Sequence, residues 1–110
     1  MGSVYTIEIA PTGYASLDKI RDRKIRNEIG KSIDGLEKSP DSQGKALVHP
    51  FEGIRSLKTY RDRFIILYQV VPRRGAVSVL LVGERKAGKE SDVYALARKL
   101  LKTLLGREED

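Results

Sequence analysis

The stretch "IRSLKTYRDRFIILYQV", residues 54–70, decides the fold of this chain. Its two parts, residues 54–60 and 63–71, are each predicted to be a β-strand. The second is a nearly unbroken apolar run, and the first carries Ile54, Leu57 and Tyr60 among polar residues. Only Arg61 and Asp62 separate the two parts, so the strands should be antiparallel neighbours joined by a tight turn. This hairpin crowds positive charge beside residues that must be buried, and that contrast raises the question of function.

The sequence before the hairpin predicts a strand followed by helical structure. Residues 4–10, "VYTIEIA", alternate and are rich in β-branched side chains, which is typical of a strand. A proline and a glycine at 11–13 break the chain, and residues 14–38 then carry apolar side chains at helical spacing. The phase of that spacing shifts near residue 21, which indicates two helices or one kinked helix. Residues 39–50, with two prolines and a glycine, are predicted to be a loop.

The sequence after the hairpin predicts one more strand and one more helix. "PRRG", residues 72–75, turns the chain into a strand at residues 76–84, and the apolar stripe from Val93 to Leu104 predicts a helix. We therefore expect a single α+β domain over residues 1–110. An N-terminal strand and a helix pair should pack on an antiparallel sheet of about four strands, followed by a C-terminal helix.

The positive charge of the chain is concentrated in one region. The net charge is +6, but residues 55–89 alone carry nine cations and two acids, Asp62 and Glu84, a local balance of +7. A basic surface of this kind suits an anionic partner, either nucleic acid or an acidic protein.

Composition also excludes several kinds of chemistry. The chain has no cysteine, so disulfides, thiolate metal sites and cysteine nucleophiles are excluded. Its single histidine, His49, lacks the spaced partners of a zinc site, and no glycine-rich phosphate-binding motif is present. We expect no metal and no cofactor. No apolar run is long enough to span a membrane, and a cytoplasmic setting is compatible with the missing cysteine.

The functional groups that remain are arginine, lysine and tyrosine, and this set suits RNA cleavage at a 2′-hydroxyl. That reaction needs positive charge around the phosphorane, a group that takes the 2′-OH proton, and support for the leaving 5′-oxygen. Arginines supply fixed planar donors, and a lysine among other cations suits the base role because like charges disfavour its protonated form. A tyrosine can stack on an extruded base.

The chain resembles a known family over essentially its whole length. Pro40, then "IRSLKTYRDRFIILYQV" and then "VLLVGERKAGKESDVYALARKLL" follow one another as in the RelE/ParE superfamily of bacterial toxins, and are closer to RelE. The resemblance implies a ribosome-dependent endoribonuclease that cleaves messenger RNA and inhibits translation, and that a cognate antitoxin neutralises. The expected partners are therefore that antitoxin, the ribosome and messenger RNA.

The resemblance also implies roles for particular residues. Lys58 falls on a catalytic lysine, Arg85 on the arginine that acts on the phosphate or leaving group, and Tyr94 on the tyrosine that stacks on the substrate base. The complete set expected at the catalytic site is Lys58, Arg61, Arg63, Arg85 and Tyr94. The residues expected to bind RNA elsewhere are Arg55, Arg73, Arg74, Lys86 and Lys89.

The sequence departs from the family pattern at Ile65. RelE-like nucleases commonly carry an arginine there, in the strand that ends in "YQV". Arg63, two residues earlier and on the same face by the period of a strand, is a candidate replacement displaced by about 6–7 Å. Two alternatives therefore stay open: a ParE-like inhibitor of DNA gyrase that needs no nuclease residues, and a catalytically degenerate module that binds RNA or antitoxin.

Overall fold

The structure of the chain, a computed structural model, describes residues 4–85 and 91–105. Its helices and strands follow one another in the order that the sequence predicts, with one short additional strand and two short 3₁₀ helices. The elements are β1 (Thr6–Ile9), α1 (Pro11–Asp18), α2 (Arg23–Gly35), η1 (Pro40–Ser42), β2 (Lys45–Ala46), β3 (Arg55–Thr59), β4 (Phe64–Val71), η2 (Pro72–Arg74), β5 (Ala76–Glu84) and α3 (Ser91–Leu104).

The sheet has the strand order β1-β5-β4-β3-β2. Strands β3, β4 and β5 form the predicted antiparallel meander. β1 instead runs parallel to β5, with Thr6 opposite Ala76. The crossover through α1 and α2 carries the chain from this edge of the sheet to the opposite edge, where β2 lies. The α+β prediction is confirmed, but the sheet is mixed and has five strands rather than about four. The fifth, β2, lies in the predicted loop and is two residues long, too short to show a strand pattern.

The shift of helical phase near residue 21 marks the boundary between two helices, α1 and α2. Asp22 caps α2, because its side chain accepts a 3.1 Å hydrogen bond from the Ile25 N–H. α1 begins at Pro11, earlier than predicted, since proline is well tolerated at the first helical position. Gly13 lets α1 lie against β5, where a Cβ atom would come within 2.7 Å of the Val79 carbonyl oxygen.

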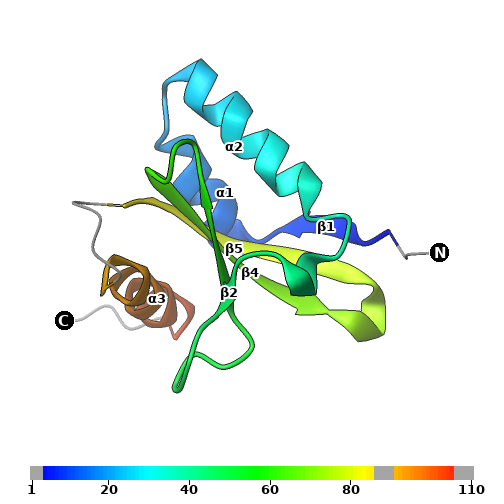
Figure 1. The fold of residues 1–110 in the computed structure, drawn as a ribbon. Helices are drawn as coiled ribbons and strands as arrows, with labels where there is room; N and C mark the ends of the chain where they lie inside the picture. The colour runs from blue at the N-terminus through cyan, green and yellow to red at the C-terminus, as the bar shows by residue number, and fades with distance from the viewer. Residues whose placement is uncertain (1–3, 86–90, 106–110) are drawn as a thin grey trace.

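Both faces of the sheet are covered. α1 and α2 lie on one side of it and α3 on the other (Figure 1). On the α2 side the buried residues include Ile29, Ile33, Leu36, Phe64, Ile66, Tyr68, Val77, Val79 and Val82. On the α3 side they are Leu47, Phe51, Ile65, Leu67, Leu80, Val93, Ala97 and Leu100. Strand β4 therefore contributes side chains to both clusters and forms the centre of the core.

The segment between α2 and β3 is fixed by polar contacts with the sheet. Tyr68 is fully buried, and its hydroxyl lies 2.8 Å from the carbonyl oxygens of both Pro40 and Gln43, which share its single proton. Burial is the main cause that raises the pKa of Tyr68 above its ordinary value. Nε and Nη2 of Arg55 donate to the same Gln43 oxygen at 3.1 and 2.9 Å. These bonds hold the segment before β2 against β3 and β4.

None of the helices in residues 4–85 and 91–105 has the length and apolar character needed to cross a membrane.

Candidate functional site

The turn between β3 and β4 has an unusual backbone. Tyr60, Arg61 and Asp62 have positive φ angles of 50°, 57° and 63°, and the Arg63 N–H donates to the Tyr60 carbonyl oxygen at 3.0 Å to close the turn. The left-handed conformation costs a residue other than glycine about 1–2 kcal/mol. Strained backbone of this kind concentrates at functional sites, so the turn marks this end of the sheet as a candidate site.

Arg85 holds this turn from the neighbouring strand. It follows the last residue of β5, and its backbone N–H donates to the Arg63 carbonyl oxygen at 2.7 Å. Its Nη1 also donates to the Asp62 carbonyl oxygen at 3.2 Å. The guanidinium of Arg85 is therefore fixed beside the strained turn and is only partly exposed.

Four of the five predicted catalytic residues meet at this end of the sheet. Lys58 is exposed near the end of β3, Arg61 and Arg63 lie in the turn, and Arg85 follows β5, whose Glu84 lies opposite Phe64 of β4. These four residues share one end of the sheet and are called here the hairpin cation cluster, with Lys58 on the α3 side and the guanidiniums of Arg61 and Arg63 beside Tyr60 on the α2 side. Its members are Lys58, Arg61, Arg63 and Arg85.

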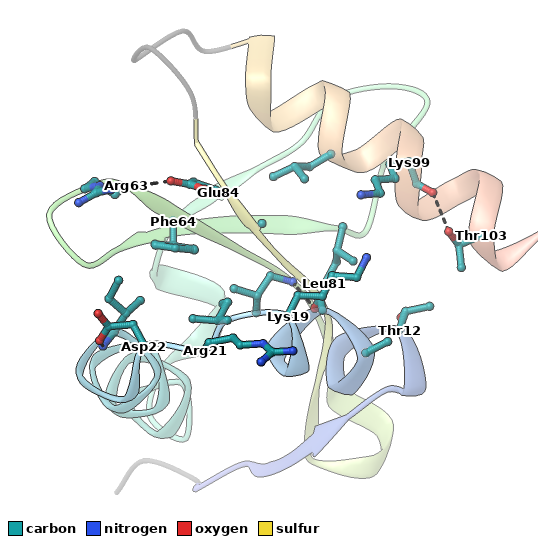
Figure 2. A pocket seen from close by; sticks show the side chains of 17 residues that line it. Thr12, Lys19, Arg21, Asp22, Arg63, Phe64, Leu81, Glu84, Lys99 and Thr103 are labelled. Atoms are coloured by element: carbon teal, nitrogen blue, oxygen red, sulfur yellow. Dashed lines mark hydrogen bonds and ion pairs between the residues drawn. The ribbon is translucent and has the colours of Figure 1, made fainter.

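The two turn arginines gather around one tyrosine. The guanidinium carbons of Arg61 and Arg63 lie 5.8 and 5.9 Å from the ring centroid of Tyr60, within range of a cation–π attraction. Arg63 also lies 3.8 Å from a carboxylate oxygen of Glu84, at the end of the sheet (Figure 2). Both arginines are exposed, so their remaining donors are accessible to an anion.

The side chains of Ile65 and Arg63 lie on opposite sides of the sheet, so Arg63 does not replace an arginine at position 65. Ile65 lies opposite Lys58 in the sheet, and its side chain is fully buried in the cluster beneath α3. Arg63 precedes the β3–β4 ladder, and its guanidinium contacts Tyr60, whose ring packs on Phe64 on the α2 side. The two-residue period assumed a strand, but Arg63 belongs to the turn, so its guanidinium points away from the side that Ile65 faces.

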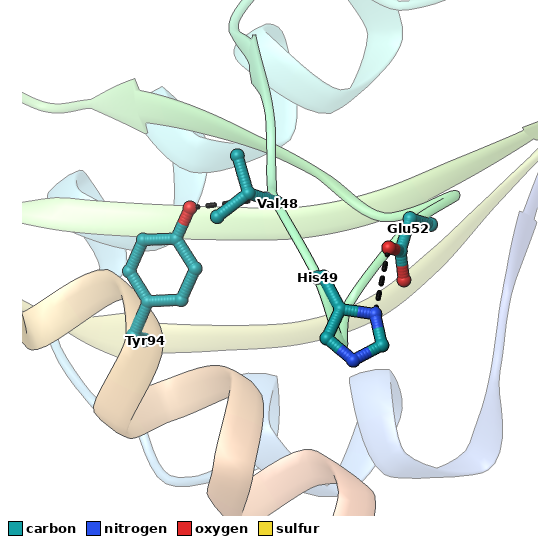
Figure 3. Close-up of polar contacts among 4 residues, drawn as sticks. All are labelled: Val48, His49, Glu52 and Tyr94. Carbon is teal, nitrogen blue, oxygen red and sulfur yellow. Dashed lines mark hydrogen bonds and ion pairs between the residues drawn. The ribbon is translucent and has the colours of Figure 1, made fainter.

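The structure places Tyr94, the fifth predicted catalytic residue, against a different segment. Its hydroxyl accepts a 3.1 Å hydrogen bond from the Val48 N–H (Figure 3). Its ring is tilted on that of Phe51, with the two centroids 6.0 Å apart. In the same segment His49 pairs with Glu52 at 2.9 Å, and both side chains are exposed. Tyr94 therefore fastens α3 to the segment before β3.

The residues predicted to bind RNA are dispersed. Arg55 is engaged with the Gln43 carbonyl oxygen described above. Arg73 and Arg74 lie in η2, at the other end of β4, about 25 Å away at the usual rise of a strand. Arg74 there pairs with Glu8 at 3.1 Å. Lys86 and Lys89 lie outside the described residues.

Sequence reasoning overlooked a polar stripe on α2. Lys24, Glu28 and Ser32 follow one another at a spacing of four residues, which puts them on one face of the helix. They line one wall of a cleft whose other wall is residues 58–62. The spacing alone could have revealed the stripe, but nothing in the sequence places it beside the hairpin.

A second and larger pocket lies between the two helical layers. It has a volume of about 660 Å³ and is lined by parts of α1, the start of α2, the end of β5 and α3 (Figure 2). Its lining mixes apolar side chains such as Ile20 and Leu96 with Lys19, Arg21 and Lys99. β1 pairs only with the first half of β5, so the second half of β5 forms the floor of this pocket.

The hairpin cation cluster offers charge rather than metal chemistry. Within residues 4–85 and 91–105 no group of three or more His, Cys, Asp or Glu side chains is placed to hold a metal ion. Fixed guanidinium and ammonium groups bind phosphate oxygens and stabilise the charge that develops on them. The arrangement therefore suits an anionic, phosphate-containing ligand.

Comparison with solved structures identifies the fold. No protein-family model and no curated protein matches the sequence. A chain of the RelBE2 toxin–antitoxin complex from Mycobacterium tuberculosis matches with a TM-score of 0.64 and 24% identity, over 76% of this chain and 93% of that one. The isolated E. coli RelE toxin matches with a TM-score of 0.61 and 22% identity, over 88% and 98%. A chain of the P. aeruginosa chromosomal ParDE system gives 0.62 and 17%, over 76% and 98%.

These likenesses establish that the chain has the fold of RelE/ParE-type toxins, as the sequence predicts. At these identities they establish the fold and leave the activity to be argued from the site itself.

Proposed function

We propose that this protein is the toxin of a toxin–antitoxin pair and acts as a RelE-like, ribosome-dependent endoribonuclease that cleaves messenger RNA. The observation that supports the proposal best is the hairpin cation cluster, since Lys58, Arg61, Arg63 and Arg85 lie at one end of a RelE-type sheet. The turn that carries two of them is strained and clamped, which is the preorganisation that catalysis requires.

The proposed chemistry is an attack of the ribose 2′-oxygen on the adjacent phosphorus. The bond from phosphorus to the 5′-oxygen breaks, leaving a 2′,3′-cyclic phosphate and a free 5′-hydroxyl. Lys58 takes the 2′-OH proton or stabilises the charge that forms, and Arg61 and Arg63 bind the non-bridging oxygens. Arg85 stabilises the leaving 5′-oxygen, which takes a proton from solvent water to become the 5′-hydroxyl. Proton transfer by a positioned group contributes about 10²–10⁴-fold to the rate.

Three other sets of residues have proposed roles at a distance from the cleaved bond. Tyr94 stacks on the substrate base once the ribosome-bound complex separates its hydroxyl from Val48, a contact that this structure contains. Arg73, at the far end of β4, contacts another part of the ribosomal RNA, whereas Arg74 beside it is engaged with Glu8. Lys86 and Lys89, which follow Arg85 in the sequence, are proposed to bind RNA on the strength of the sequence alone.

The proposed antitoxin occupies the pocket between the helical layers. This pocket combines an apolar lining with Lys19, Arg21 and Lys99, which suits an acidic, amphipathic segment that folds on binding. The edge of β5 there is closed by side chains: Thr12 donates to the Leu80 carbonyl oxygen at 2.6 Å, and the hydroxyl of Ser16 accepts from the Val82 N–H at 2.9 Å. The segment should therefore bind through side chains, as a helix does, rather than as an added strand.

The second candidate is a ParE-like inhibitor of DNA gyrase, and a particular observation favours it. Ile65 is fully buried where RelE-like nucleases commonly carry an arginine. The fold of the ParDE chain also matches as closely as that of RelE. The hairpin cation cluster opposes this candidate, because a protein that only binds gyrase does not need it.

Induction of the chain in cells distinguishes the two candidates. We expect new messenger RNA ends within translated codons soon after induction, and none when ribosomes are removed from messages by an initiation inhibitor. A Lys58→Ala, Arg85→Ala variant should lose both cleavage and growth arrest. Arg74→Ala, which also removes one positive charge, should retain them. Growth arrest with a DNA-damage response and intact messages would contradict the proposal and support the gyrase inhibitor.

A further inference from the structure

The cleft between α2 and the β3–β4 turn is called here the α2 cleft. One wall is the stripe of Lys24, Glu28 and Ser32, and the other is formed by residues 58–62. Its volume is about 500 Å³, within the range of sites that hold small ligands or one unit of a polymer. It lies on the α2 side of the turn, whereas Lys58 in the sheet faces the α3 side with Ile65.

A hydrogen bond joins the two walls of the α2 cleft. The hydroxyl oxygens of Ser32 and Thr59 lie 2.6 Å apart, and Thr59 is only 6% exposed. This contact ties the middle of α2 to the end of β3. The two walls are therefore held at a fixed separation, which favours a ligand of defined size.

The cations of the α2 cleft come from three separate elements. Lys24 lies on α2, Lys58 on β3 and Arg61 in the turn, and all three are exposed. Glu28 and Asp62 place two carboxylates in the same cleft. Lys24 and Arg61 around these two acceptors suit a ligand that carries an anionic group together with N–H donors, whereas the side chain of Lys58 faces the α3 side.

Tyr60 adds an aromatic surface to this arrangement. Its ring packs edge-on against Phe64, with centroids 6.3 Å apart and an interplanar angle of 66°, and it is half-buried. Phe64 supports the ring, and the guanidiniums of Arg61 and Arg63 lie within cation–π range of it, so a base that stacks there takes the place of one guanidinium. Rigid aromatic rings beside cations are the common means of holding an unstacked nucleotide base.

From these features we infer that the α2 cleft binds one nucleotide of single-stranded RNA, in addition to the nucleotides at the cleaved bond. Lys24 holds its phosphate, the base stacks on Tyr60, and Glu28 accepts hydrogen bonds from the base N–H groups. This inference rests on the proposed function for its source of RNA. It adds a site on the α2 side of the turn that steers the strand around the hairpin.

The test is direct binding of RNA without ribosomes. Fluorescence anisotropy measures the affinity of the full chain for a labelled eight-nucleotide RNA with 2′-O-methyl groups, which cannot be cleaved, over a series of salt concentrations. Lys24→Ala should reduce the slope of log affinity against log salt by about 0.7, the value for one phosphate contact to a single strand. Arg26→Ala, an equally exposed cation elsewhere on α2, should leave the slope unchanged.

A second variant tests the stacking surface. Tyr60→Leu keeps an apolar group on Phe64 but removes the ring, and should weaken binding about tenfold, within the range that stacking of one base contributes. If the parent does not bind this RNA, or if Lys24→Ala and Tyr60→Leu bind as the parent does, the inference is wrong. If the parent cuts messages but both variants bind the RNA as tightly as the parent does, this inference alone is overturned. If both variants weaken RNA binding as expected but the parent cuts no message on ribosomes, the proposed function alone is overturned.

Discussion

Replacing Ile65 by arginine tests whether this position belongs to the core or to the catalytic site. Ile65 is fully buried, and its neighbours beneath α3 include Phe51, Val93 and Leu100. Removing an isoleucine from such a place costs about 2–5 kcal/mol, and an unpaired buried charge costs about 3–5 kcal/mol. We therefore expect Ile65→Arg to lower the free energy of unfolding by at least about 3 kcal/mol.

The assay is urea denaturation followed by circular dichroism, with Ile65→Val as the control. The control removes one methyl group and should cost about 1 kcal/mol while leaving messenger RNA cleavage unchanged. For a chain of this size, the loss in Ile65→Arg corresponds to a fall in Tm of more than about 10 °C. An Ile65→Arg protein that is as stable as the parent and cleaves RNA faster would refute the core assignment, because its guanidinium would have to reach the substrate.

Three further results are expected. Gly44→Ala should destabilise the fold by more than about 2 kcal/mol in urea denaturation, because Gly44 has a φ of 64° and its Cβ would overlap the Ser56 carbonyl oxygen; equal stability would contradict the assigned backbone. The pKa of Tyr68 is raised in the folded state. The contribution of its protonated hydroxyl to the free energy of unfolding is therefore fully present below pH about 10 and is lost as the pH rises through the folded pKa. Alkaline unfolding should therefore depend less steeply on pH in Tyr68→Phe than in the parent, and identical slopes would exclude this linkage. Arg74→Ala should cost less than about 1 kcal/mol, as for other exposed ion pairs, and leave RNA cleavage intact; lost cleavage would place the far end of β4 in the site.

The strands and helices could be predicted because their signals are local. The hairpin at residues 54–70 shows its strands through hydrophobic pattern and its turn through two polar residues. The boundary between α1 and α2 appears as a phase shift. The parallel pairing of Thr6 with Ala76 leaves no such signal, since its two strands are about seventy residues apart in sequence and each would look the same in an antiparallel pair.

The site was predictable in part for the same reason. Lys58 and Arg61 are close in sequence, and a hairpin necessarily brings them together, while Arg85 joins them because β5 ends beside the start of β4. The direction of Arg63 was not predictable, because the alternation of side chains holds only within a strand. The left-handed backbone at Tyr60 was equally hidden, since neighbouring contacts rather than glycine impose it.

The central claim is that the hairpin cation cluster cleaves RNA, and cleavage by purified components tests it most directly. Ribosomes programmed with a defined message, saturated with the purified protein, give a single-turnover rate from the appearance of the cut fragment. The account predicts that the parent cuts the message only on ribosomes, that Lys58→Ala is slower by about 10²–10⁴-fold, and that Arg74→Ala matches the parent. A Lys58→Ala rate equal to that of the parent, or a message left intact by the parent, would contradict the claim.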